Sequence, residues 1–88
     1  MKNTVTQEQV DQIFAKSKKE VSTIFNKCTV VSCQLPNGFI IVEYSACVDP
    51  QNYDYYMGAK ICEERIKNKI WEFEAYQLHC KLHEQKLG

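Results

Sequence analysis

The chain has 88 residues, and its eleven Lys and Arg residues balance eleven Asp and Glu residues, so its formal net charge is zero. This length excludes a two-domain enzyme and a doubly wound cofactor-binding fold. The balanced charge argues against a protein that holds duplex nucleic acid through bulk positive charge. With 44% hydrophobic and 25% charged residues, the composition is typical of a single globular domain, which we assign to residues 1–88.

The first predicted element is an amphipathic helix over residues 6–26. Thr6 and Gln9 have the spacing of a capping box, which satisfies free backbone N–H groups at a helix start. Residues that would line one helical stripe follow at three- and four-residue steps: Val10, Ile13, Phe14, Ser17, Val21, Ile24 and Phe25.

A β-hairpin is predicted next, with strands at residues 28–35 and 39–47 joined by a turn at Pro36, Asn37 and Gly38. Both faces of this hairpin carry apolar residues. The sequence offers no evident third strand, and a two-stranded sheet is only marginally stable in water. We therefore expect a second copy of the chain to extend or cover the sheet.

A long helix is predicted over about residues 54–84, capped by Asp49 or Asp54. At 1.5 Å per residue it would span about 45 Å, which is longer than the core of so small a domain can cover. Its predicted core stripe consists of Ala59, Cys62, Ile66, Ile70, Phe73, Gln77 and Cys80. The fold class is therefore predicted as α+β, in the order α-β-β-α, and the protein as an obligate oligomer.

Residues 1–10 are polar, and no stretch approaches the roughly 18 apolar residues of a membrane span. We therefore expect no signal peptide, no membrane anchor and a cytoplasmic location. The five cysteines are odd in number and form no CxxC pair, so we expect small buried hydrophobic side chains rather than disulfides or ligands.

A metal site and a nucleophilic site both have little support. His79 and His83 have a spacing that zinc sites use, with Cys80 between them, but no further ligand lies at matching spacing. Cys33 and Cys47 lie in predicted strands, with no histidine before His79. The acidic pairs of the last helix, Glu63 with Glu64 and Glu72 with Glu74, are typical of a solvated surface. We expect no catalytic residue, no metal and no cofactor.

Arg65 is the only arginine, and Lys69 follows it by four residues on the same helical face. Together they could bind a phosphate, the arginine through two parallel bonds and the lysine as a point charge. Asp49 and Asn52 could hydrogen-bond a ribose or a base edge, and Phe39 could stack on a purine.

A purely structural interpretation competes with this one. In that case Arg65 pairs with Glu64 or Glu72 across the surface, and Phe39 is buried in an oligomer interface. Spacing alone favours this structural interpretation over the binding site.

Two blocks of sequence carry a family resemblance. The first is the run of residues 26–39, which contains LPNGF, and the second is SACVDPQNYD at residues 45–54. The helix that carries Gly58, Cys62, Arg65 and Lys69 continues the match. Over about residues 4–78 the chain resembles the Gp49-like family of small phage and prophage proteins. Members of this family have long been described only as uncharacterised phage gene products.

The α-β-β-α pattern also resembles the first Thoeris anti-defence family, phage proteins that act as sponges for cyclic nucleotide signals of bacterial immunity. Members hold their ligands without cleaving them; these include glycocyclic ADP-ribose and, in some members, cyclic oligonucleotides of the CBASS defence system. They assemble as dimers, and in some cases as hexamers of three dimers. The resemblance implies a non-enzymatic homo-oligomer that binds a cyclic nucleotide in the cytoplasm of the host bacterium.

That resemblance also implies a pocket between chains and a role for each candidate residue. Phe39 would stack on the base, with Tyr53 as the alternative ring, and Asn52 or Asp49 would recognise the nucleotide.

Arg65 and Lys69 would bind the phosphates. Here the sequence departs from the family pattern, in which two arginines stand one turn apart. A lysine at the second position cannot form the two parallel bonds of a guanidinium.

The alternative function is a protein-interaction module that engages a host protein through its apolar last helix. Its anchors would be Trp71, Tyr76, Leu78 and Leu82. A small phage enzyme or nucleic-acid binder is a third hypothesis, which the neutral charge and the missing motifs disfavour.

Overall fold

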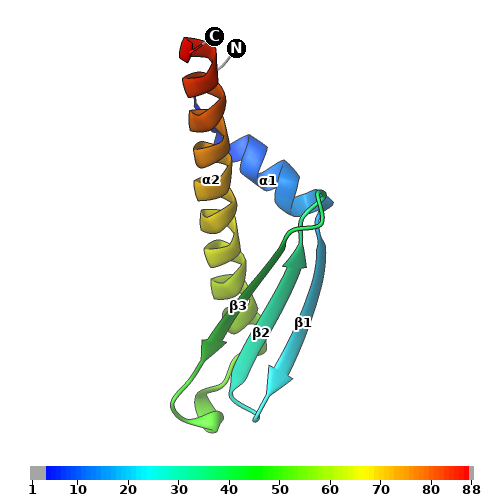
Figure 1. Ribbon diagram of the computed structural model, residues 1–88. Helices are drawn as coiled ribbons and strands as arrows, with labels where there is room; N and C mark the ends of the chain where they lie inside the picture. The colour runs from blue at the N-terminus through cyan, green and yellow to red at the C-terminus, as the bar shows by residue number, and fades with distance from the viewer. Residues whose placement is uncertain (1–3, 88) are drawn as a thin grey trace.

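A computed structural model describes residues 4–87 and shows two α-helices, a short 3₁₀ helix and a three-stranded antiparallel sheet (Figure 1). The elements are α1 (Gln7–Lys16), β1 (Lys18–Ile24), β2 (Cys28–Gln34), β3 (Ile40–Ala46), a 3₁₀ helix (Pro50–Asn52) and α2 (Tyr55–Leu87). The strand order is β1-β2-β3, and α2 lies over β2 and β3 before it extends beyond the sheet toward α1. The predicted α+β class, hairpin and long helix are confirmed.

The prediction of one helix over residues 6–26 is wrong, because α1 ends at Lys16. Its start follows the sequence: Thr6 and Gln9 form the predicted capping box. At its end, Ser17 adopts an extended conformation, and its hydroxyl donates to the Ile13 carbonyl at 2.7 Å. The chain then leaves the helix axis and enters β1.

β1 is a third strand that the sequence analysis missed. It pairs with the whole of β2, from Lys18 opposite Gln34 to Ile24 opposite Cys28. Residues 25–27 connect the two strands: Phe25 and Asn26 have φ values of 51° and 57°, in the left-handed region, and the Lys27 N–H donates to the Ile24 carbonyl at 3.3 Å. The sheet is therefore not the lone hairpin that we expected.

The core lies between α2 and the inner face of the sheet. Because successive residues of a strand point to opposite faces, Thr29, Val31 and Cys33 of β2 and Ile41 of β3 share the inner face, and all four are buried. A stripe of α2 packs against them; its buried members are Gly58, Cys62, Ile66 and Ile70.

α2 approaches the sheet closely at Gly58. A Cβ atom at this position would lie 2.9 Å from the Thr29 Cβ and closer still to its hydroxyl oxygen. Only a residue without a side chain lets the helix begin this near to β2.

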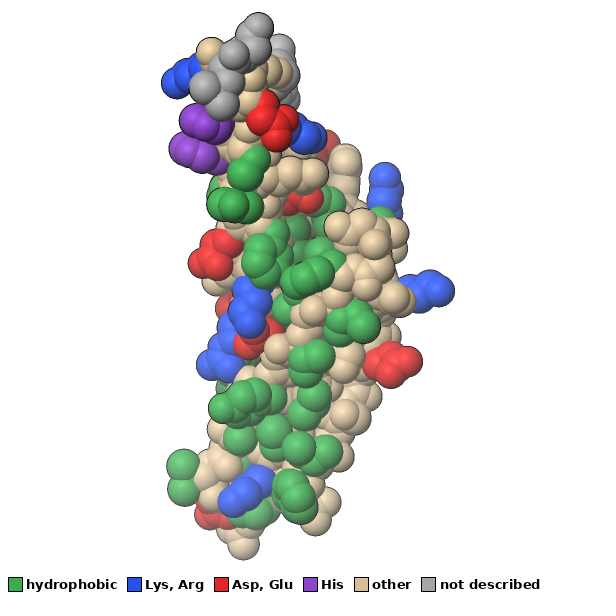
Figure 2. All heavy atoms as spheres, in the orientation of Figure 1, with side chains coloured by type: hydrophobic (Ala, Val, Ile, Leu, Met, Phe, Trp, Pro, Cys, Tyr) green, Lys and Arg blue, Asp and Glu red, His purple; other side chains and the backbone are tan. Residues whose placement is uncertain are grey.

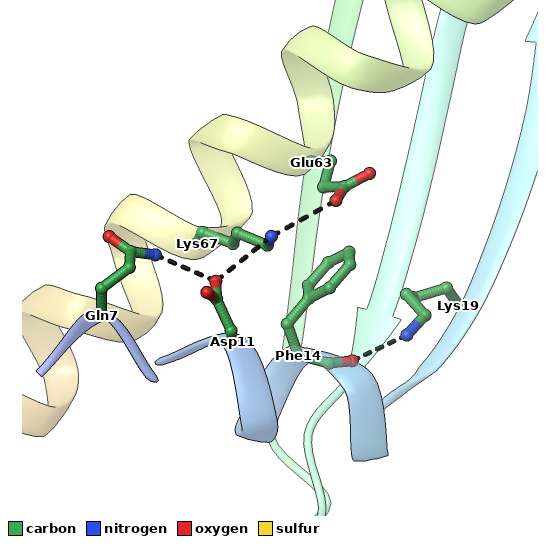
Figure 3. Close-up of polar contacts among 6 residues, drawn as sticks. All are labelled: Gln7, Asp11, Phe14, Lys19, Glu63 and Lys67. Carbon is green, nitrogen blue, oxygen red and sulfur yellow. Dashed lines mark hydrogen bonds and ion pairs between the residues drawn. The ribbon is translucent and has the colours of Figure 1, made fainter. Parts of the chain in front are cut away.

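α1 is attached to the middle of α2 by packing and charge (Figure 3). Val10 is fully buried, and Lys67 of α2 lies 3.3 Å from Asp11 and 3.4 Å from Glu63. A hydrogen bond from Gln7, together with Lys67, lowers the pKa of Asp11. Burial alone would lower the pKa of Lys67, but its bonds to Asp11 and Glu63 raise it.

The two predicted caps have separate roles. The Asp54 carboxylate accepts hydrogen bonds from the backbone N–H groups of Tyr56 and Met57 and so caps α2, whereas Asp49 caps the preceding 3₁₀ helix. Within residues 4–87, no helix combines the length and the apolar character needed to cross a membrane.

Candidate functional site

Arg65 and Lys69 lie where α2 runs along the open edge of β3. The Arg65 guanidinium donates a hydrogen bond from Nη1 to the Tyr44 carbonyl at 2.6 Å, and Lys69 Nζ lies 2.5 Å from the Glu43 carboxylate. Among the ion pairs of the described residues, none joins Arg65 to Glu64 or Glu72. The structure therefore turns both cations of this helical face toward the strand.

Strand geometry explains why Arg65 finds a carbonyl there. Two hydrogen bonds at the ends of β3 point toward β2. The Phe39 carbonyl accepts the Leu35 N–H, and the Cys47 N–H donates to the Lys27 carbonyl. In an antiparallel strand the alternate residues, including Tyr44, present their backbone groups to the other side. Arg65 satisfies one of these edge carbonyls and keeps further N–H donors, because a guanidinium carries five.

Phe39 lies at the start of β3, beside Phe73 of α2. The ring centroids are 5.3 Å apart at an interplanar angle of 76°, an edge-to-face arrangement. Phe39 is 52% exposed, so about half of the residue remains accessible. The two rings border a hollow of about 290 Å³ that is also lined by Leu35, Asn37, Ile70, Glu74 and Gln77. Sequence analysis assigned Phe73 to the core stripe and so missed its place beside Phe39.

Asp49, Asn52 and Tyr53 lie together in the segment between β3 and α2. The Asp49 carboxylate accepts the Gln51 N–H at 3.0 Å, and its backbone carbonyl accepts the Asn52 N–H at 2.9 Å. Asn52 and Tyr53 line a hollow of about 180 Å³ that also includes Met57 and other residues at the end of β3 and the start of α2.

Tyr53 is fixed by its hydroxyl, which lies 2.6 Å from the Thr29 hydroxyl and 2.8 Å from the Thr23 hydroxyl. These bonds tie the segment before α2 to β1 and β2. Sequence analysis considered Tyr53 only as a stacking ring and missed this role, since β1 was not foreseen.

The candidate residues fall at opposite ends of one strand. β3 separates Phe39 from the Asp49–Tyr53 segment, and seven strand residues span about 20 Å. Arg65 and Lys69 lie between these ends along α2. One chain therefore brings Arg65 together with Lys69, and Asn52 together with Tyr53, but it does not bring Phe39 to Asn52.

The thiols and the potential metal ligands are dispersed. All five cysteines are free; Cys28, Cys33 and Cys62 are buried, as predicted, whereas Cys47 and Cys80 are partly exposed. Burial raises the pKa of the Cys62 thiol. In the described part of the chain, no three or more His, Cys, Asp or Glu residues are placed to hold a metal ion.

The apolar anchors expected on α2 do not form one surface. Trp71, Leu78 and Leu82 line a hollow of about 240 Å³ together with Val5. Tyr76 is largely exposed and does not line this hollow. Leu78 also packs against the core and is only partly available to a partner.

Comparison with known protein families finds a match over most of the chain. The sequence model of the "Phage protein (N4 Gp49/phage Sf6 gene 66) family" matches residues 3–82. No curated protein and no solved structure matches the chain.

Proposed function

This chain belongs to the phage protein (N4 Gp49/phage Sf6 gene 66) family, and from that premise we propose that it sequesters a cyclic nucleotide signal without cleaving it. Such a phage sponge would act on bacterial immune signals, such as glycocyclic ADP-ribose or the cyclic oligonucleotides of CBASS. The proposal combines the resemblance to the Thoeris anti-defence family with the arrangement of polar and aromatic groups along β3.

One observation carries the proposal: Arg65 and Lys69 occupy the same face of α2, between an aromatic pair at one end of β3 and a hollow lined by Asn52 and Tyr53 at the other. A cyclic nucleotide needs cations for its phosphates, a flat apolar surface for its base and polar groups for its ribose or base edge. Each of these features lies within reach of the same strand.

The contacts that Arg65 and Lys69 already make are compatible with phosphate binding. Arg65 is held by a single carbonyl, so most of its donors remain available to a phosphate. Lys69 keeps about half of its side chain exposed while it pairs with Glu43. A phosphate would therefore meet cations that are already positioned, which reduces the entropy lost on binding.

Binding should be tested with a panel of cyclic dinucleotides, cyclic trinucleotides and cyclic ADP-ribose isomers. The purified protein is mixed with the panel, filtered and heat-denatured, and the released compounds are identified by mass. A signal that is depleted from the filtrate and released intact supports a sponge and identifies its ligand. Cleaved products would indicate an enzyme, and retention of no compound would refute the proposal.

The matched variants are Arg65→Ala and Lys60→Ala. Each removes one cation from α2, but residue 60 lies about 140° around the helix from residue 65. We expect Arg65→Ala to weaken binding by about 1.5–3 kcal/mol, the scale of hydrogen bonds to a charged group, and Lys60→Ala to leave it nearly unchanged. Equal losses in the two variants would show that only general charge matters.

A protein-interaction role is the second candidate, because Trp71, Leu78 and Leu82 share an open hollow on the far half of α2. If the nucleotide panel gives no ligand, Trp71→Ala becomes the test variant, and loss of a host protein from pull-downs would support this role.

A further inference from the structure

The hollow beside the Phe39–Phe73 pair is lined by polar side chains that the proposed phosphate contacts do not use. Asn37 lines it from the turn between β2 and β3, and Glu74 and Gln77 line it from α2. Its volume of about 290 Å³ lies at the lower end of the usual range for ligand pockets, so it suits a single flat ring system better than a whole nucleotide. These polar groups are therefore placed to contact the edge of a ring that stacks on Phe39.

Glu74 differs from Glu72, the neighbouring carboxylate with which the sequence analysis paired it. Glu72 is exposed, whereas Glu74 is half-buried and lines the hollow. Within residues 4–87, none of the ion pairs involves Glu74. Charged side chains that are partly withdrawn from water usually have a partner, and an ionised carboxylate only accepts hydrogen bonds. Glu74 therefore offers two acceptor oxygens to a ligand that carries donors.

Asn37 presents the opposite kind of hydrogen-bonding group. Its side-chain carbonyl oxygen accepts the Phe39 N–H at 3.0 Å, which leaves the amide NH₂ as the end that can donate to a ligand. Two backbone hydrogen bonds of 2.8 Å also hold this turn, from Leu35 N–H to the Phe39 carbonyl and from Gly38 N–H to the Leu35 carbonyl. The hollow therefore combines a donor on a fixed turn with a pair of acceptors on α2.

We propose that this hollow binds a guanine base and that Glu74 selects it. Guanine carries two adjacent donors, N1–H and the 2-amino group, next to the O6 acceptor on the same edge. Glu74 accepts both donors and Asn37 donates to O6, while the ring stacks on Phe39. Adenine has one donor and one acceptor on the corresponding edge, and a carboxylate cannot donate to that acceptor.

This inference rests on the proposed function, because it names the base of the sequestered nucleotide. Lys69 precedes Phe73 by four residues, so the two share a helix face and lie about 6 Å apart along the axis. Arg65 lies one turn further along that face. Figure 2 shows basic side chains directly beside the hydrophobic band that runs down the middle of the displayed face. A guanine nucleotide in the hollow therefore has cations for its phosphate within about two helical turns.

The base preference is tested with cyclic di-GMP and cyclic di-AMP, which share one backbone and differ only in the base. In isothermal titration calorimetry we expect cyclic di-GMP to bind at least about 10-fold more tightly, the scale of one hydrogen bond to a charged group. The 5′-monophosphates of guanosine, inosine and adenosine extend the comparison, and their weaker binding is measured by saturation-transfer NMR. Inosine monophosphate lacks the 2-amino group and should bind with intermediate affinity.

The matched variants are Glu74→Gln and Glu72→Gln, which remove the same charge from the same helix. A glutamine amide at position 74 can accept only one of the two guanine donors, so we expect guanine affinity to fall about 10-fold or more. Glu72→Gln should bind like the wild type. Asn37→Asp is a second variant, because it keeps an acceptor for the Phe39 N–H but loses the donor to O6. Circular dichroism checks that all variants are folded.

Equal affinity for guanine and adenine nucleotides, or equal affinities of Glu74→Gln and Glu72→Gln, would overturn the guanine site. The proposed function is scored separately by the nucleotide panel. An intact ligand that contains only adenine would support the sponge and refute the guanine site. A guanosine monophosphate preference that Glu74→Gln abolishes, in a protein that retains no cyclic nucleotide, would support the guanine site and refute the sponge.

Discussion

On the inner face of the sheet, Val31, Cys33 and Ile41 are at most 4% exposed beneath α2, whereas Ile40, Val42 and Tyr44 on the outer face are more than half exposed. Along β3, Ile41 of the inner group lies between Ile40 and Val42 of the outer group, and both groups are largely apolar. What differs is the covering element, since α2 supplies buried partners on one side only. Hydrophobicity alone therefore does not separate residues that stabilise the chain from residues that are free to associate.

The largest effect should come from the centre of the covered face. Ile66 of α2 is fully buried, and Ile66→Ala should lower the free energy of unfolding by about 3 kcal/mol through lost burial and a residual cavity. Urea denaturation measures this loss. A cost below about 1 kcal/mol would mean that the inner face is not the main source of stability.

Neighbouring isoleucines give the sharpest version of the comparison. Ile41→Thr should cost about 2–3 kcal/mol, because it removes buried apolar volume and buries a hydroxyl. Ile40→Thr should cost less than about 0.5 kcal/mol, as for most exposed positions. Both are measured by urea denaturation at the same protein concentration. Equal costs would show that the two faces are energetically alike.

Gly58 tests how closely the inner face is packed. Gly58→Ala should destabilise the chain by about 1–2 kcal/mol, because overpacking against Thr29 outweighs the gain of up to about 1 kcal/mol in helix propensity. In a double-mutant cycle with Thr29→Ala, followed by thermal unfolding, the double variant should lose less stability than the sum of the losses of the two single variants. An increase in stability for Gly58→Ala alone would contradict the close contact.

The smallest effect concerns the half-exposed ion pair that attaches α1. The folded-state pKa of Asp11 is lowered from 3.8, so its contribution to stability is present above that value and is lost as the pH falls through the folded value. Wild type and Asp11→Asn should therefore differ in melting temperature near neutral pH and converge in acid. If the melting temperatures still differ at a pH below both the folded and the unfolded pKa of Asp11, the effect does not come from ionisation of this carboxyl group.

The sequence predicted the elements whose signals are local. The capping box at Thr6 and Gln9, the turn at residues 36–38 and the start of α2 after Asp54 all follow from short patterns. β1 was missed because Val21, Ile24 and Phe25 continue the helical spacing set by the preceding residues. In addition, every residue of β1 is exposed, so its sequence does not alternate between apolar and polar residues as a half-buried strand would. Pairing with β2, a non-local interaction, decided its conformation.

The candidate site also has a part that local sequence patterns predicted and a part that depends on how distant elements pack. Helical spacing correctly placed Arg65 and Lys69 on one face, since residues four apart are neighbours on a helix. It could not give the Tyr44 carbonyl or Glu43 as their partners, because those depend on how α2 lies along β3. Nor could it show that β3 holds Phe39 away from Asn52.

The buried thiols give the folded chain an internal reporter of its own opening. Cys33 and Cys62 are fully buried on the two sides of the core, and burial raises the pKa of Cys62, so little reactive thiolate is present in the closed state. An alkylating reagent would reach them only when α2 lifts from the sheet or the chain unfolds. Their labelling rates, against those of the more accessible Cys47 and Cys80, would time that opening without any added probe.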